Sequence, residues 1–186
     1  EHISTIALVG PKSRQLLQQL VTDIDLSREA FPFMHSRGAT INGLPVRIAR
    51  ISFSGELAFE INVEWTYALH IWERLWALGR PYDLTAYGTV TMHVLRAEKG
   101  YIIVGQDTDG TVTPQDAGLT WAIGKNKRDY VGIRGLLRRD LVSDGRKQLV
   151  GLKTVDPKIV LEEGAQIVAN PNQPVPMTMI GHACPG

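Results

Sequence analysis

The sequence predicts an α+β fold in which helices pack against an antiparallel sheet, and two features carry this prediction. First, residues 37–42, 44–52 and 58–63 are strand-like runs. The dipeptide Asn42-Gly43 between the first two runs is typical of a tight hairpin turn. Second, residues 64–78 repeat apolar side chains at helical spacing, which predicts an amphipathic helix. Hairpin-connected strands beside such helices are typical of the α+β class.

Other elements are expected on both sides of these runs. Residues 3–9 are β-branched and apolar and predict a strand, and Pro11 suits the first turn of a helix that continues to Val21. A further helix is expected over residues 85–99, with Gly100 as its end. The apolar stripe of helix 64–78 is expected to pack into the core. Its members are Trp65, Ala68, Leu69, Trp72, Leu75 and Trp76.

Shorter elements are expected after residue 100. The predicted strands are residues 101–104, 119–123, 148–155, 159–161 and 166–169, and residues 132–141 are predicted as a short basic helix. Because the pattern becomes all-β from residue 148, we expect one domain over residues 1–145 and the beginning of a second over residues 146–186. The chain starts without methionine, and we expect it to be a piece of a longer polypeptide.

The composition narrows the classes of function. No apolar run approaches the roughly 20 residues that span a bilayer, and a net charge of +1 argues against a general nucleic-acid binder. The single cysteine, Cys184, allows no internal disulfide and fits a cytoplasmic protein. The histidines lack the spacing of a metal site. We therefore expect no metal, no membrane and no nucleic acid.

The most informative segment is SFSGELAFE at residues 52–60. It places a glycine turn and two acids, Glu56 and Glu60, at the start of a strand. Alternation along that strand puts Phe59 on one face and Glu60 on the other. An exposed strand acid is the ordinary interpretation of Glu60. The alternative is a carboxylate that accepts a planar pair of N–H donors, from a guanidinium or from the edge of a pterin.

Four segments in register resemble the folate-dependent aminomethyltransferases, the family of the glycine-cleavage T-protein. SFSGELAFE is similar to the family signature GYTGExG(aromatic)E, and VLRAEKGY at residues 94–101 is similar to its LRLExG segment. GQDTDGTVTP at residues 105–114 resembles its Gx(D/E)x(D/E)xxxxP loop, and GLTW at residues 118–121 resembles its GLxW strand. The resemblance implies the second part of a folate-binding domain, followed by a truncated C-terminal β-barrel domain.

The resemblance also assigns candidate site residues. By position, Glu60 is the carboxylate that accepts the pterin ring of tetrahydrofolate, and Glu56 is expected to stabilise the turn. Phe53 and Ser54 replace a tyrosine and a threonine and are expected to line the folate pocket. Trp121 either flanks the aminobenzoyl ring or belongs to the core. The catalytic aspartate of the family lies upstream, so we expect no catalytic residue and only half a pocket in this chain.

Within the family, MHVLRAEKGY at residues 92–101 most resembles the alpha subunits of heterotetrameric sarcosine oxidases. The transferases' Ala-Arg-Asp is replaced here by Thr91, Met92 and His93, which favours that branch. The resemblance implies a parent that oxidises sarcosine and captures the one-carbon unit of the resulting imine as 5,10-methylenetetrahydrofolate. It also implies FAD or FMN, NAD and partner subunits outside this segment. A dimethylglycine dehydrogenase, a glycine-cleavage aminomethyltransferase and a non-catalytic folate-binding module are the alternatives.

One charged stretch keeps several interpretations. Residues 125–147 contain eight basic and three acidic side chains. A solvated face is the usual meaning of such a run. Docking of an acidic partner subunit and attraction of a polyglutamyl folate tail are the alternatives.

Overall fold

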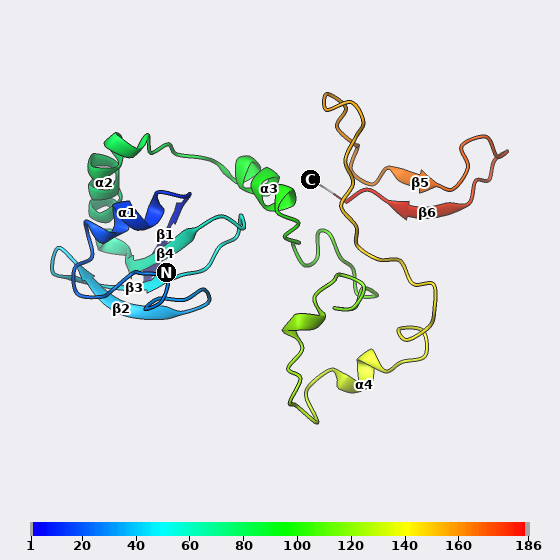
Figure 1. The fold of residues 1–186 in the computed structure, drawn as a ribbon, viewed down its shortest axis with the longest axis horizontal. Coiled ribbons are helices and arrows are strands. Elements are labelled where there is room, and N and C mark those ends of the chain that lie inside the picture. Colours follow the sequence, from blue (N-terminus) through cyan, green and yellow to red (C-terminus); the bar gives the residue numbers. More distant parts are fainter. Residues whose placement is uncertain (1, 185–186) are drawn as a thin grey trace. The chain divides into compact units, whose positions relative to one another are not determined.

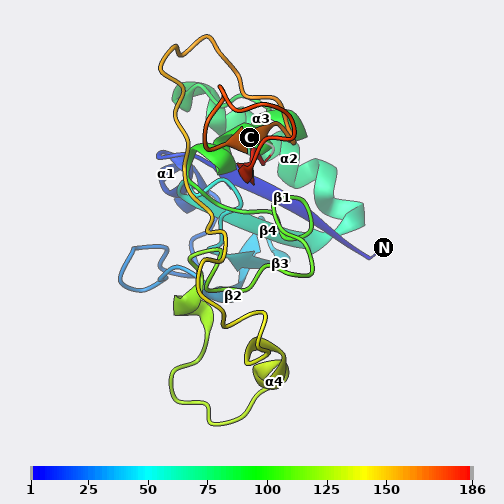
Figure 2. The ribbon, with the colours of Figure 1, turned by 90° about the vertical axis from the view of Figure 1, so that its right-hand side faces the viewer.

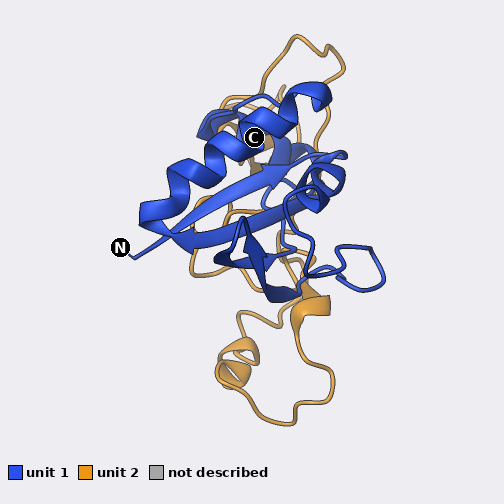
Figure 3. Cartoon of the chain, turned by 90° about the vertical axis from the view of Figure 1, so that its left-hand side faces the viewer, with its two compact units in different colours: residues 1–101 blue, residues 102–186 orange. Residues whose placement is uncertain are grey.

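The computed structural model describes residues 2–184, which divide into two compact units between Tyr101 and Ile102 (Figure 3). Each unit is described by itself. Unit 1 holds most of the regular structure, and unit 2 is dominated by turns and loops.

Unit 1 is built on a four-stranded antiparallel sheet. Its strands are β1 (Ile3–Val9), β2 (Ser36–Ile41), β3 (Leu44–Ala49) and β4 (Ala58–Glu64), in the order β1-β4-β3-β2 (Figure 2). The predicted hairpin is confirmed, because Asn42 and Gly43 have φ angles of 51° and 78° between β2 and β3. Two consecutive residues with positive φ are typical of the hairpin turn that matches the twist of the strands.

Two helices cover one face of this sheet (Figures 1 and 3). They are α1 (Ser13–Gln18) and α2 (Ala68–Gly79), and α2 follows a 3-10 turn at Trp65–Tyr67. Leu16 and Leu17 of α1 and Ile71 of α2 belong to the same core as Ile6 and Ile61 of the central strands. The expected arrangement of helices on an antiparallel sheet is therefore confirmed for unit 1.

The buried stripe of α2 differs from the predicted one. Ile71 and Leu75 are buried, whereas Trp72 is 43% exposed. Leu69 and Trp65 are exposed as well, so the expectation that all these side chains lie in the core is wrong. The reason is that Ile71 and Leu75, which are spaced i, i+4, form the side of α2 that packs on the sheet. The larger indole rings consequently lie toward the edge of the helix.

The last helix of unit 1 is shorter than expected. After a 3-10 turn at Arg80–Tyr82, the chain is irregular up to Gly88, and α3 spans Thr89–Glu98 rather than residues 85–99. Gly88 is extended, with φ −93° and ψ 178°, so helical geometry cannot begin before Thr89. Arg96 near its end is buried and donates a hydrogen bond to the Tyr101 carbonyl at 3.2 Å.

Unit 2 contains little regular structure. A 3-10 turn spans Thr120–Ala122, helix α4 spans Ile133–Leu136, and strands β5 (Gln166–Val168) and β6 (Met179–His182) form a hairpin. The strands expected at residues 101–104, 119–123, 148–155 and 159–161 are not formed, because a strand needs a hydrogen-bonded neighbour. Helix 132–141 is reduced to one turn, since Gly132 and Gly135 weaken it.

Two further findings concern the expected β-barrel and the absence of a membrane-spanning helix among the described residues. The described part of unit 2 has one two-stranded sheet, so the β-barrel expected from residue 146 stays a prediction. Within residues 2–184, no helix combines the length and the apolar character that crossing a membrane requires.

A partly buried ion pair holds the loops of unit 2 together. The Arg146 guanidinium donates hydrogen bonds to both carboxylate oxygens of Asp116, from Nε at 3.0 and 3.1 Å. It also donates to the carbonyls of Thr111 at 2.7 Å and Asp140 at 3.0 Å. The hydrogen bonds from Arg146 lower the pKa of the Asp116 carboxyl well below its ordinary value, and burial opposes them only in part. This pair therefore ties residues 111–116 to residues 140–149.

This network makes the order of unit 2 dependent on pH. The pKa of Asp116 is depressed in the folded chain, so its stabilisation is fully present above the unfolded value of about 4. It is lost as the pH falls below that value toward the folded pKa. We expect amide protection at Leu149, which donates to the Asp116 carbonyl, to decrease in this acidic range. Hydrogen exchange corrected for intrinsic rates measures this.

Substitutions separate this pair from general acid effects. Asp116→Asn should lower local stability by about 1.5–3 kcal/mol, the range for hydrogen bonds to charged groups, and should remove most of the acid dependence. Asp144→Asn, at an exposed position of the same stretch, is the matched control and should change neither. Equal pH profiles for wild type and Asp116→Asn would contradict the role of the pair.

The rotated stripe of α2 gives a second prediction. Ile71→Ala should destabilise unit 1 by about 2–5 kcal/mol, as truncation of a buried aliphatic side chain does. Trp72→Ala, one position along, should cost about 1 kcal/mol or less, because its ring is partly in water. Urea unfolding of the two variants tests this, and a larger loss for Trp72→Ala would place the indole in the core.

Candidate functional site

The loop between β3 and β4 is shaped by a glycine that no other residue can replace without strain. Gly55 has a φ of +76°, and a Cβ atom built there would lie 2.7 Å from Cβ and Cγ of Lys99. Next to it, Ser54 is buried and its hydroxyl accepts the Glu56 N–H at 3.4 Å. Glu56 accepts the Leu57 N–H at 3.0 Å, so it stabilises the turn as expected. These contacts fix where β4 begins.

Glu60 lies on the face of β4 opposite the core. Its direct neighbours across the sheet are Ala7 in β1 and Ala49 in β3. Phe59 and Ile61 point to the opposite face and are fully buried, so the predicted alternation is confirmed. Within residues 2–184, no hydrogen bond or ion pair engages the Glu60 carboxylate. Methyl groups on both sides leave its two oxygens accessible to a planar pair of donors.

Phe53 and Ser54 occupy different environments. Phe53 is 42% exposed, and its ring centroid lies 6.3 Å from that of His93 in α3. Its ring face is thus available to a ligand on one side. The Ser54 hydroxyl, by contrast, is used inside the turn. The folate contacts expected of both residues stay predictions.

Trp121 and the basic stretch belong to unit 2. Trp121 is 75% exposed in the 3-10 turn, so it does not lie in a core of unit 2. Its contact with the aminobenzoyl ring stays a prediction. Most basic side chains of residues 125–147 are also exposed. Arg146 is the exception, because it binds Asp116 and is thereby removed from any binding surface.

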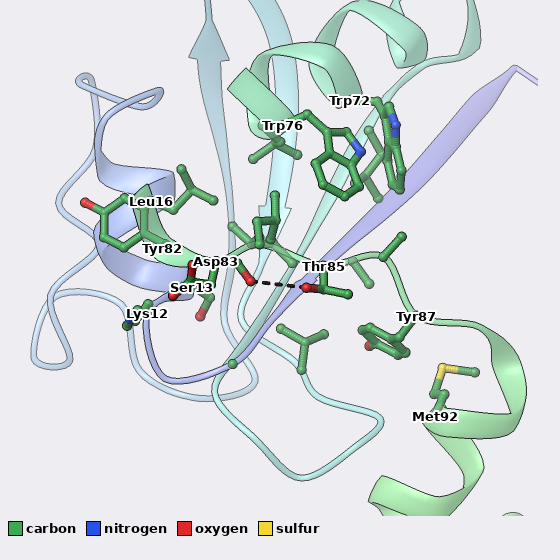
Figure 4. Close-up of a pocket in the computed structure, with 18 of the residues that line it drawn as sticks. Lys12, Ser13, Leu16, Trp72, Trp76, Tyr82, Asp83, Thr85, Tyr87 and Met92 are labelled. Atoms are coloured by element: carbon green, nitrogen blue, oxygen red, sulfur yellow. Dashed lines mark hydrogen bonds between the residues drawn. The ribbon is translucent and has the colours of Figure 1, made fainter. Parts of the chain in front are cut away.

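One cavity of unit 1 is an apolar groove beside β1. It has a volume of about 440 Å³ and lies between β1, α2 and residues 82–92 (Figure 4). The rings of Trp72 and Trp76 form its upper wall, with centroids 5.9 Å apart in an edge-to-face arrangement. Lys12 and Asp83 lie at one end. The groove suits an apolar group and brings together no acid–base pair aimed at a common point.

A smaller cavity of about 260 Å³ lies inside the β3–β4 loop. It is lined by Phe33, Arg50, Ser52, Gly55, Glu56, Leu57, Ala58 and Tyr101. The Nε atom of Arg50 and the hydroxyl of Ser52 are both buried and have no hydrogen-bond partner among the described residues. Burial of the guanidinium is the main cause that lowers the pKa of Arg50, and the positive charges of Arg14 and Arg28 lower it further. Arg50 and Ser52, which carry these unused donors, therefore line a cavity next to the strand that carries Glu60.

Sequence reasoning missed both cavities. The groove was missed because the indole rings of Trp72 and Trp76 were expected in the core. The apolar stripe of residues 64–78 is wider than one helix face, and this width was a signal of apolar surface beyond the core contact. Arg50 and Ser52 gave no periodic signal, since they follow the end of β3 in an irregular segment. Only the closure of the loop brings them to one cavity.

Comparison with known proteins identifies the family. The model of the GCVT N-terminal domain family matches residues 1–127. The chain belongs to this family. The resemblance to folate-dependent aminomethyltransferases, inferred from the four segments, is thereby confirmed.

Several curated relatives match most of the chain. It is 52% identical over 171 residues to the sarcosine oxidase subunit alpha of Corynebacterium sp. (strain P-1). This match covers 91% of this chain and 18% of that protein. It is 32% identical over 153 residues to the aminomethyltransferase of Halothermothrix orenii, covering 82% of this chain and 42% of the relative. The mitochondrial dimethylglycine dehydrogenase of Mus musculus is 28% identical over 169 residues, and this match covers 90% of this chain and 19% of that protein. The chain thus spans less than a fifth of the sarcosine oxidase subunit.

The turn at Gly55 gives a prediction with an internal control. Gly55→Ala should destabilise unit 1 more than Gly43→Ala, although both glycines have nearly the same positive φ. Each substitution carries roughly 1–2 kcal/mol of backbone strain, but only at Gly55 does the new Cβ meet the base of another side chain, that of Lys99. Thermal unfolding of the two variants measures the difference. Equal losses would show that the contact with Lys99 is unimportant.

Proposed function

We propose that residues 1–145 form part of the tetrahydrofolate-binding domain of a sarcosine-oxidising enzyme. The observation that carries the proposal is the unpaired Glu60 carboxylate between two alanines on the open face of the sheet. A pterin ring presents N3–H and a 2-amino group side by side. One carboxylate accepts both in a charge-assisted pair, as it does from arginine. The membership of the chain in the GCVT family supports this assignment.

The proposed reaction follows from the atoms involved. Oxidation of the N-methyl group of sarcosine gives an imine, and its two electrons would pass to the flavin and then to oxygen, which leaves as hydrogen peroxide. The methylene carbon of the imine passes to the nitrogens of tetrahydrofolate while glycine leaves. The product is 5,10-methylenetetrahydrofolate. In this chain Glu60 binds and orients the pterin, and Phe53 and Trp121 are proposed to flank the rest of the folate. The aspartate that serves the transfer is expected upstream, and the sites for FAD or FMN and NAD are expected in other parts of the parent enzyme.

The sarcosine branch is favoured over aminomethyl transfer by two findings. Among the relatives cited above, the one with the highest identity bears the name sarcosine oxidase subunit alpha. In addition, Met92 stands where the transferases carry an arginine. We therefore propose other sarcosine oxidase subunits as partners. A dimethylglycine dehydrogenase is the second candidate, supported by the 28% identity to such a protein. The cytoplasmic location, the β-barrel over residues 146–186 and the domain boundary after residue 145 are proposed on the same resemblance.

The role of Glu60 is tested by Glu60→Gln in the full-length protein. We expect tetrahydrofolate affinity to fall by about 1.5–3 kcal/mol, the range for a hydrogen bond to a charged group, because the neutral amide presents only one acceptor. Titration calorimetry measures the affinity. Glu64→Gln is the matched control, since Glu64 lies on the same strand and face and is exposed.

Two outcomes would decide between functions. Unchanged tetrahydrofolate affinity in a folded Glu60→Gln variant would remove the assignment of Glu60. Sarcosine oxidation without folate should be unchanged in this variant, because Glu60 has no role in that step. If folate binds but the full-length protein forms no methylenetetrahydrofolate from sarcosine, the chain is a non-catalytic folate-binding module.

A further inference from the structure

Arg50 and Ser52 line the cavity inside the β3–β4 loop, and each carries a hydrogen-bond donor that no described residue accepts. The backbone of Arg50 is fixed at the end of β3, because its N–H donates to the His35 carbonyl and its own carbonyl accepts the Met34 N–H. One guanidinium nitrogen, Nη1, donates to the Phe31 carbonyl at 2.8 Å. The buried Nε remains without a partner, as does the Ser52 hydroxyl two residues later. Buried polar groups without partners are rare in native proteins and indicate a missing ligand or water.

The charges around this cavity favour an anion. Within residues 2–184, no ion pair joins Arg50 to a carboxylate. Glu56 also lines the cavity, but one of its oxygens accepts the Leu57 N–H and the other lies 3.8 Å from Nζ of Lys99. Arg14 and Arg28 are close enough to Arg50 to influence its charge, and Glu29 offsets them only in part. A guanidinium in such a setting is short of negative charge.

We propose that this cavity binds a carboxylate group, held by the guanidinium of Arg50 and the hydroxyl of Ser52. A guanidinium edge and a neighbouring hydroxyl match the two oxygens of a carboxylate. The volume of about 260 Å³ is enough for a small carboxylate and is below the roughly 300–1,000 Å³ typical of pockets for drug-sized ligands. The ring of Phe33 and the side chain of Leu57 supply apolar walls, which strengthen the charged contact by excluding water.

The position of the cavity connects it with the proposed function, on which the identity of the ligand rests. Ala58 lines the cavity and lies on the same face of β4 as Glu60, although Ala58 itself is buried. Two residues along a strand separate equivalent atoms by roughly 7 Å. The proposed carboxylate site is therefore next to the part of β4 that carries Glu60. Two molecules of the proposed reaction carry such a group: the amino acid that leaves as glycine, and the glutamate tail of folate.

The test measures carboxylate binding at this loop in the full-length protein. Acetate and, separately, glycine are titrated while hydrogen exchange of the peptide covering residues 50–58 is followed by mass spectrometry. We expect both probes to slow exchange in this peptide. Arg50→Gln should raise the acetate concentration required by about 10- to 100-fold, the ratio that a charge-assisted hydrogen bond gives. Ser52→Ala should raise it by about 3- to 10-fold.

The controls address folding and the second ligand group. Arg50→Gln also removes the contact with the Phe31 carbonyl, so Ser52→Ala, whose hydroxyl has no partner to lose, is the independent variant. Arg47→Gln changes an exposed arginine three residues earlier on β3 and should leave acetate binding unchanged. Glu60→Gln should weaken binding of 6-methyltetrahydropterin, which has no glutamate tail, and leave acetate binding intact. Weaker 6-methyltetrahydropterin binding with unchanged acetate binding in Glu60→Gln separates the carboxylate site from the proposed pterin site.

The same variants identify the source of the carboxylate. If Arg50→Gln weakens tetrahydrofolate binding but not 6-methyltetrahydropterin binding, the site takes the folate tail. If it abolishes the effect of glycine and leaves tetrahydrofolate unchanged, the site takes the amino acid. The proposal is overturned if acetate and glycine leave residues 50–58 unaffected in the wild type, or if folded Arg50→Gln and Ser52→Ala respond to acetate as the wild type does.

Discussion

The alternation of side chains along β4 is the constraint on which unit 1 depends. This strand pairs with β1 on one side and β3 on the other, and its odd-numbered side chains from Phe59 to Val63 are buried under the helices. A slip of one residue would expose these side chains and drive Glu60 into the apolar core without a partner. The hydrophobic effect, acting on residues that touch no ligand, therefore determines where the carboxylate lies.

The parts of the fold that could be predicted are those with strong local patterns. Strand β1 and the β2–β3 hairpin follow from β-branched runs and from Asn42-Gly43, whose geometry is local. The existence of α2 was equally clear, but its buried side was not, because periodicity gives an apolar stripe wider than one contact face. Which of Ile71 and Trp72 turns inward is decided by fit to the sheet. In unit 2, strand-like runs found no neighbouring strand, and pairing is a non-local property that sequence pattern does not contain.

The candidate site also has features that local sequence patterns predict and features that they do not. The face of Glu60 was predicted, because it depends only on the period of two in its own strand. The environment of Ser54 and the joint position of Arg50 and Ser52 were not, since they depend on how the loop closes over Phe33 and Tyr101. Residues 1–127 carry the family match, yet the cavity in this loop is a property of packing, which the motif alone does not describe.

A comparison of two arginines shows why the unused donors matter. The partly buried guanidinium of Arg146 donates to Asp116 and to two carbonyls, so it holds loops together. Arg50 is similarly placed at the junction of a strand and a loop, but its buried Nε faces no acid. Because Gly55 fixes the turn that joins Arg50 and Ser52 to the start of β4, these donors and the Glu60 carboxylate keep a constant separation. A ligand that carries both an N–H pair and a carboxylate would meet two preorganised contacts, and preorganisation is what converts such contacts into affinity.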